Sequence, residues 1–175
     1  MDCKIVFERM YYLLRQSFEN LLNELLKQTI KVYGERLVSL AVFGSVGRGT
    51  PRADSDVDIL IIVDNLPPGR IKRVVEFEKV EESIEPVLND MNKRGISTVL
   101  SPVLKTKKEV IAGSLLFLDM IEDARILYDK NHFFSSFLES FQKRLQKMGA
   151  KRIKRGGAWY WVLKDNYKVG ETFEI

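Results

Sequence analysis

Hydrophobic residues recur every three or four positions from residue 5 to residue 33, which is the spacing of one face of an α-helix. No proline or glycine interrupts the pattern until Gly34, a residue type that often ends helices. The apolar positions are Phe7, Met10, Leu14, Phe18, Leu21 and Leu25. We predict one long amphipathic helix that covers a sheet, and that could also bind a helical partner protein or a second copy of the chain.

Two short apolar runs come next, and each has the length of a buried β-strand. The first, residues 37–43, is mostly apolar, and the second, residues 56–63, is apolar on both faces beyond its acidic start. Strands of this kind are usually covered on both sides, so we expect them to be central in the sheet. A glycine-rich polar segment, residues 44–55, joins them, and residues 45–50 could begin a short helix.

Helical and extended patterns alternate over the rest of the chain. Residues 70–94 predict a charged helix with a kink or a break near Glu85, because Pro86 cannot donate the helical hydrogen bond. Residues 96–104 predict a third strand, in which Pro102 favours an edge position or a strand end. The remaining predictions are a helix that begins at the capping box of Thr106 and Glu109, a short helix over 115–122, a strand over 124–128, a helix capped by Asp129 or Asn131 and ended by Gly149, and a strand or hairpin arm within the tail.

This order of elements predicts an α/β (α+β) fold, a small mixed β-sheet flanked by helices, with a helical and basic C-terminal extension. We expect residues 1–128 to form the main domain and residues 129–175 to pack on it as a helix followed by a strand or hairpin. The chain has 175 residues, of which 45% are hydrophobic, so it can form one core without disulfides.

Composition excludes several classes of protein. Cys3 is the only cysteine, so no internal disulfide can form, and no Cys/His cluster exists for zinc. No apolar run approaches the roughly 20 residues of a membrane-spanning helix, and the N-terminus lacks the layout of a secretory signal. We therefore expect a cytoplasmic protein that does not associate with membranes.

The segment between the two apolar strands carries the candidate chemistry. A strand that ends in Gly44-Ser45 and turns into a helix points free backbone N–H groups at whatever binds above it, and phosphate is the expected ligand. Gly44 allows close approach, Ser45 can add a hydroxyl, and Arg48 or Arg52 can add a guanidinium. The segment is neither a P-loop nor a dinucleotide-binding fingerprint.

Two aspartates stand one residue apart at the start of the second strand. Residues i and i+2 of a strand share a face and lie about 6.6 Å apart, so Asp56 and Asp58 should be neighbours. Two carboxylates this close repel unless a cation binds them. Oxygen ligands without histidine or cysteine suit Mg²⁺ or Mn²⁺, which also bind substrate phosphates.

Asp56 lies twelve residues after Gly44 of the Gly44-Ser45 pair, and Asp58 follows it, with Arg48 and Ser55 in the segment between. This arrangement resembles the polymerase-β-like nucleotidyltransferase superfamily. The likeness is greatest to the minimal nucleotidyltransferases of archaea and bacteria. It implies the nucleotidyltransferase fold and a two-metal transfer of a nucleoside monophosphate from a nucleoside triphosphate (NTP) to a hydroxyl acceptor, with pyrophosphate leaving. The acceptor could be a small molecule, an RNA end or a protein side chain.

The resemblance also assigns roles to these residues. Gly44 and Ser45 would hold the β- and γ-phosphates, with Arg48 and Ser55 as further nucleotide contacts, and Asp56 and Asp58 would bind the metals.

Active members of the superfamily usually carry a third carboxylate on a later strand. The expected strand over residues 96–104 contains no acid, and Glu109 and Asp119 are the nearest acidic candidates downstream. The loss of a general base lowers rates about 10²–10⁴-fold. An alternative is therefore a catalytically weak nucleotide-binding module, or an antitoxin-like module that binds a partner protein.

The C-terminal part is basic. Seven of the thirteen residues from 143 to 155 are lysine or arginine, and aromatic residues follow directly. Such a combination can bind single-stranded nucleic acid, which leaves an RNA-binding accessory protein as a further hypothesis. The candidate contacts are Lys151, Arg152, Lys154 and Arg155. The alternative interpretation is a solvated helix end beside a small aromatic core.

Overall fold

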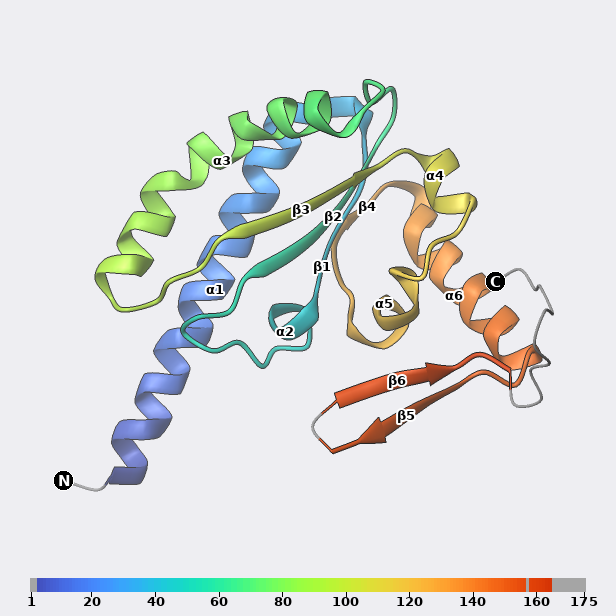
Figure 1. The fold of residues 1–175 in the computed structure, drawn as a ribbon. Helices are drawn as coiled ribbons and strands as arrows, with labels where there is room; N and C mark the ends of the chain where they lie inside the picture. The colour runs from blue at the N-terminus through green and yellow to red at the C-terminus, as the bar shows by residue number, and fades with distance from the viewer. Residues whose placement is uncertain (1–2, 157, 165–175) are drawn as a thin grey trace.

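The computed structural model describes residues 3–156 and 158–164 of the 175-residue chain. At its centre is a four-stranded sheet with the order β3-β2-β1-β4 (Figure 1). The strands are β1 (Leu37–Phe43), β2 (Val57–Val63), β3 (Leu100–Lys105) and β4 (Arg125–Asp129). β1 is antiparallel to both of its neighbours, whereas β2 and β3 are parallel, so the predicted small mixed sheet is confirmed.

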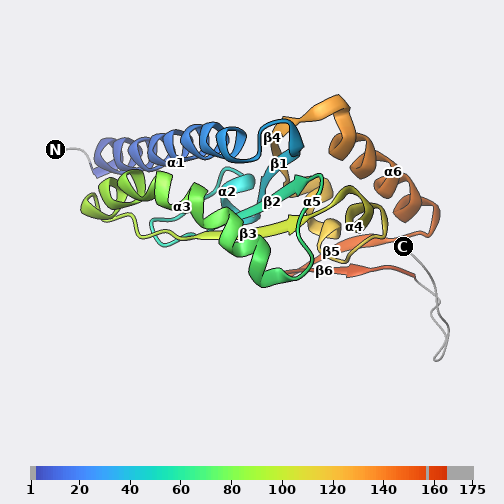
Figure 2. The same cartoon turned by 90° about the horizontal axis from the view of Figure 1, so that it is seen from above.

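Helices cover both faces of this sheet (Figure 2). One face packs against α1 (Cys3–Tyr33) and α3 (Arg70–Lys93), and the other against α4 (Lys107–Ile111), α5 (Phe117–Asp123) and α6 (Phe133–Lys147). In β2, Ile59 and Ile61 face the first layer of helices, while Leu60 and Ile62 face the second. The apolar pattern on both faces of this strand therefore reflects two separate hydrophobic cores.

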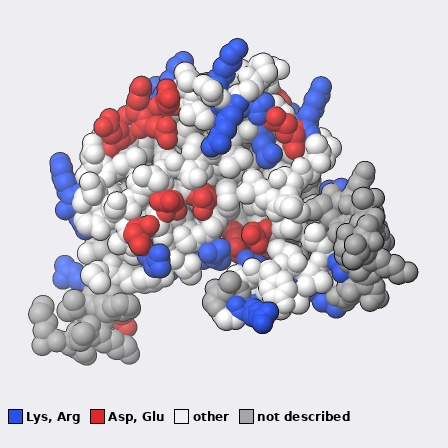
Figure 3. Space-filling view, in the orientation of Figure 1, with Lys and Arg blue, Asp and Glu red and all other residues white. Residues whose placement is uncertain are grey.

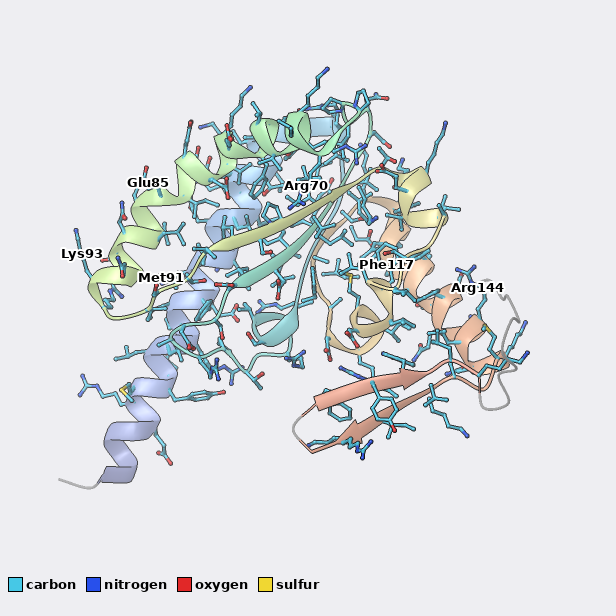
Figure 4. The ribbon with its side chains drawn as sticks, in the orientation of Figure 1. Arg70, Glu85, Met91, Lys93, Phe117 and Arg144 are labelled. Atoms are coloured by element: carbon cyan, nitrogen blue, oxygen red, sulfur yellow. The ribbon has the colours of Figure 1, made fainter. Side chains whose placement is uncertain are left out.

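The helix α3 continues through Pro86, so of the two predicted outcomes, a kink or a break, the break does not occur. Proline removes one helical hydrogen bond, but Ile84 and Met91 are buried on either side of it and keep the helix packed in the core that includes α1. Met91 is buried, whereas Glu85 and Lys93 are exposed and project away from the sheet (Figure 4). Tertiary packing thus keeps the helix continuous across the proline.

The strand β3 occupies an edge of the sheet, the position that Pro102 favoured. It begins at Leu100, later than predicted, because its partner β2 begins only at Val57, which pairs with Leu100. Just before the strand, the Ser97 N–H donates instead to the carbonyl of Ala53 in the loop.

Two helix boundaries are set by side chains as predicted. Thr106 and Glu109 form the capping box of α4. The N-cap position of α6 is His132, but it is the carboxylate of Asp129, not Asn131, that accepts the N–H groups of Phe134 and Ser135 in the first turn. Short 3₁₀ helices, η1 (Gly34–Arg36) and η2 (Lys130–His132), link α1 to β1 and β4 to α6.

A separate two-stranded antiparallel sheet, β5 (Lys151–Arg155) and β6 (Ala158–Val162), follows α6 and confirms the predicted hairpin. Trp161 and Leu163 pack against the core beneath α5 and α6. Residues 165–175, the end of the expected extension, lie outside the described residues. Among the helices that the structure describes, none combines the length and the apolar character needed to cross a bilayer.

Candidate functional site

The phosphate loop, which is the predicted phosphate-binding segment of residues 44–55, lies directly beside Asp58, one of the two predicted metal ligands. β1 ends at Phe43, and the short helix α2 (Gly44–Gly47) begins at the next residue. Gly44 has a φ of +66°, and a Cβ atom at this position would overlap the carboxylate of Asp58. Only glycine adopts this conformation and allows such close approach at little cost. A glycine at position 44 therefore allows the loop to contact β2 at Asp58.

A cavity of about 450 Å³ lies over this loop and the start of β2. Acidic and basic side chains gather over the same part of the molecule in Figure 3. The lining residues are Ser45, Arg48, Thr50, Arg52, Asp54, Ser55, Asp56 and Asp58. The structure therefore brings five of the sequence-predicted nucleotide and metal residues into one cavity, and the sixth, Gly44, lies against Asp58.

The two aspartates differ in burial. Asp58 is the second residue of β2 and is half-buried, whereas Asp56 precedes the strand and is exposed. Burial raises the pKa of Asp58, the negative charge of Asp56 raises it further, and the positive charge of Arg48 partly opposes both. Asp58 therefore carries unfavourable negative charge that a bound cation would stabilise.

Ser55 shapes the loop as well as lining the cavity. Its hydroxyl accepts the Arg52 N–H at 2.9 Å, and its own N–H donates to the Arg52 carbonyl at 3.2 Å. The side chain of Arg52 extends to Asp54, with which it forms an exposed ion pair at 3.1 Å. These contacts close the turn that returns the chain to β2.

Arg48 is held by a residue that the sequence reasoning missed. Its Nη1 donates to Asp123 Oδ2 at 2.7 Å, and Asp123, the last residue of α5, is only 6% exposed. Gly47 permits this approach, because a Cβ there would lie 2.6 Å from the carbonyl oxygen of Asp123. The available signal was the spacing of Asp119, Glu122 and Asp123, which places three acids on one face of α5.

The acidic candidates for a third metal ligand are engaged elsewhere. Glu109 belongs to the capping box of α4 and forms an ion pair with Arg73 at 2.9 Å, which lowers the pKa of Glu109 to about 2. Asp119 accepts a hydrogen bond from the indole N–H of Trp161 at 3.1 Å. Within residues 3–156 and 158–164, no group of three or more His, Cys, Asp or Glu side chains could hold a metal ion.

The predicted nucleic-acid residues have different surroundings. Lys151, Lys154 and Arg155 are exposed on the hairpin, and Lys154 lies over the ring of Trp159 at 5.3 Å. The side chain of Arg152 is only 8% exposed and forms ion pairs with acidic residues of α5. Arg152 therefore attaches the hairpin to the domain rather than extending into solvent.

Comparisons with known proteins identify a family for this chain. The family model of the nucleotidyltransferase domain matches residues 22–112. A Methanocaldococcus jannaschii protein named "Putative protein adenylyltransferase MJ1305" is 33% identical over 135 residues, which cover 76% of this chain and 86% of that protein.

Solved structures of toxin–antitoxin proteins are also similar. One of them, a toxin–antitoxin structure with AMP-PNP, is 16% identical to this chain, with a TM-score of 0.46. The match covers 73% of this chain and 91% of the chain in that structure. Another, a mutant MntA–HpeT complex, is 14% identical with the same coverage and a TM-score of 0.44. These likenesses are too low to bear on function. The family match includes β1, the loop, β2 and both aspartates, and on that match the chain belongs to the nucleotidyltransferase domain family.

Proposed function

We propose that this protein transfers an adenylyl group from ATP to a hydroxyl group on a protein side chain. The observation that carries the proposal is the cavity in which the Gly44-Ser45 loop faces the paired carboxylates of Asp56 and Asp58. Family membership supports nucleotidyl transfer, and the named relative supports ATP as donor and a protein as acceptor.

The loop and its arginine would bind the triphosphate. The backbone N–H groups at the start of α2 and the hydroxyl of Ser45 can donate to the β- and γ-phosphates. Arg48 adds positive charge at the same rim of the cavity. In the reaction, the acceptor oxygen forms a bond to the α-phosphorus, the bond from that phosphorus to the bridging oxygen breaks, and pyrophosphate leaves. The acceptor proton passes to the solvent that reaches the cavity.

Asp56 and Asp58 fit a Mg²⁺ site. The donor set is all oxygen, and Mg²⁺ commonly uses one or two carboxylates together with substrate phosphates. The raised pKa of Asp58 marks charge that the protein leaves poorly compensated. Mg²⁺ bound there would supply Lewis-acid stabilisation of the phosphate oxygens.

A second candidate function is nucleotide binding with little turnover, as in a module that neutralises or senses a partner protein. The observation that favours it is the residue paired with Asp58 on the neighbouring strand β3, which is Ser101 rather than an acid. This candidate uses the same cavity, so only a measurement of turnover separates the two.

The test is label transfer from ATP that carries the label either on the α- or on the γ-phosphate, with Mg²⁺ and a cell extract as the source of acceptors. Adenylyl transfer predicts label on protein from α-labelled ATP alone, and protease but not ribonuclease removes it. Ribonuclease-sensitive label would instead identify an RNA acceptor. Tight ATP binding without transfer of either label would favour the binding module.

Two variants make the test specific to the site. Asp58→Asn should abolish transfer, with a loss of at least about 10²-fold, because it removes one of the two carboxylates that would hold Mg²⁺ beside the reacting phosphates. The matched control is Asp64→Asn, which makes the same change just beyond the other end of β2, where Asp64 forms a half-exposed ion pair with Lys107. Equal loss of transfer in both variants would contradict a specific role for Asp58.

A further inference from the structure

One buried carboxylate is shared by two arginines that are far apart in the sequence. Asp123 Oδ2 accepts Arg48 Nη1 at 2.7 Å and Arg152 Nη2 at 3.0 Å, and Asp123 Oδ1 accepts Arg152 Nη1 at 3.3 Å. Arg48 comes from the phosphate loop and Arg152 from the first strand of the C-terminal hairpin. The hairpin is thereby linked to the candidate nucleotide site through a single side chain.

Arg152 is firmly placed for this contact. It also pairs with Glu122 at 2.8 Å and approaches Asp119 at 3.7 Å, so three acids of α5 surround it. Its guanidinium lies 4.7 Å from the centre of the Trp159 ring, which covers it from the side of the hairpin. Such a buried guanidinium is held in one position more tightly than an exposed one.

The arrangement determines how much positive charge Arg48 can offer to a ligand. Arg48 is 42% exposed at its side chain, while the carboxylate of Asp123 is 7% exposed, so their attraction is only partly screened by solvent. Burial would raise the pKa of Asp123, but the hydrogen bonds from Arg152 and Arg48 outweigh it and lower that pKa, so Asp123 stays charged. Without Arg152, this charge would act on Arg48 alone.

We propose that Arg152 is a positioning residue for the nucleotide site: it neutralises Asp123, so that Asp123 orients Arg48 without cancelling the charge that Arg48 presents to the triphosphate. This inference rests on the proposed function, in which Arg48 meets phosphate. Both Asp123 and Arg152 lie outside residues 22–112, so the match to the nucleotidyltransferase domain does not account for them.

The proposal is tested by the affinity for a non-hydrolysable ATP analogue with Mg²⁺, measured by titration calorimetry. Arg152→Gln should raise Kd at least about fivefold, the scale of a modest coupling between sites. Arg152→Lys keeps the charge and should recover part of the loss. Lys143→Gln is the control, because it removes an exposed cation from the same basic run of residues 143–155, and it should leave Kd within about twofold.

A double-mutant cycle separates positioning from a merely structural role. If Arg152 acts through Asp123, then Arg152→Gln should change Kd less than about twofold when Asp123 is already Asn. Equal effects of Arg152→Gln in both backgrounds would overturn the proposal, because Arg152 would then act independently of Asp123.

Hydrogen exchange of the 44–50 segment gives a readout that needs no nucleotide. Arg152→Gln and Asp123→Asn should each speed exchange there, and Lys143→Gln should not. If the wild-type protein bound no nucleotide, the proposed function would fail, and unchanged exchange in Arg152→Gln would separately overturn the link from Arg152 to the loop.

Discussion

Gly44→Ala probes the contact between the phosphate loop and the aspartates most sharply. Two costs add at this position. The φ of +66° is unfavourable for alanine by about 1 kcal/mol. The new methyl group would also overlap the carboxylate of Asp58, and forced overpacking of this kind costs about 1–3 kcal/mol. The backbone has little room to yield, because Asp58 pairs with Phe43 across the sheet.

Gly49→Ala is the matched control. Gly49 has a similar φ of +72°, but the nearest atom to its added Cβ is the flexible end of Arg15 at 3.6 Å. It should therefore lose only the backbone term of about 1 kcal/mol. We expect chemical denaturation to show a larger loss of unfolding free energy for Gly44→Ala, by about 1–3 kcal/mol, than for Gly49→Ala.

The same pair of variants tests the site. Displacing the Asp58 carboxylate by the size of a methyl group should lower adenylyl transfer about 10²-fold in Gly44→Ala. With Asp58→Ala in the background, Gly44→Ala should destabilise the protein no more than Gly49→Ala does. If the extra loss persisted in that background, or if Gly44→Ala transferred label at the wild-type rate, the reasoning about this contact would be refuted.

Two further predictions concern stability. Glu109→Gln should destabilise the protein by about 1 kcal/mol at pH 7, a value reduced for screening because the Glu109 side chain is 41% exposed. The pKa of Glu109 is about 2 in the folded protein, against 4.5 ordinarily. The stability that Glu109 contributes should therefore be fully present above pH 4.5 and lost as the pH falls toward 2. Urea titrations of the wild-type protein and Glu109→Gln across this range should converge at the acid end. Asp129→Ala should cost about 2 kcal/mol in urea denaturation, because it removes the acceptor for two N–H groups of α6 and for the Ser39 hydroxyl. Glu35→Ala, which removes a fully exposed carboxylate nearby, should leave stability unchanged, and an equal loss in both would contradict the capping role.

Local patterns were sufficient for much of the fold. The helix from Cys3 to Tyr33 follows from its apolar spacing, and the strand Leu37–Phe43 has the predicted bounds. The capping box of Thr106 and Glu109 is confirmed because its two hydrogen bonds depend on residues only three apart. The helix and the capping box form through contacts between near neighbours in the sequence, and the strand is marked by its own apolar run, although its pairing partners β2 and β4 are remote.

Features that depend on distant residues could not be predicted in this way. The helix α3 does not break at Pro86, one of the two outcomes predicted there, because packing against α1, remote in sequence, holds it together. The sharing of Asp123 by Arg48 and Arg152 joins residues that are 75 and 29 positions from it. The spacing of the three acids on α5 can be recognised in the sequence, but their basic partners cannot. Nothing in the local sequence distinguishes Arg152, whose side chain is largely buried, from Arg155, which is exposed in the same basic run.

The central claim is that the Gly44-Ser45 loop and the paired aspartates form one nucleotide site. Titration calorimetry of ATP with Mg²⁺ into the wild-type protein, Asp58→Asn and Asp64→Asn tests it most directly. The account predicts binding that Asp58→Asn weakens at least about tenfold and that Asp64→Asn leaves unchanged. Binding of equal strength in all three proteins would contradict it.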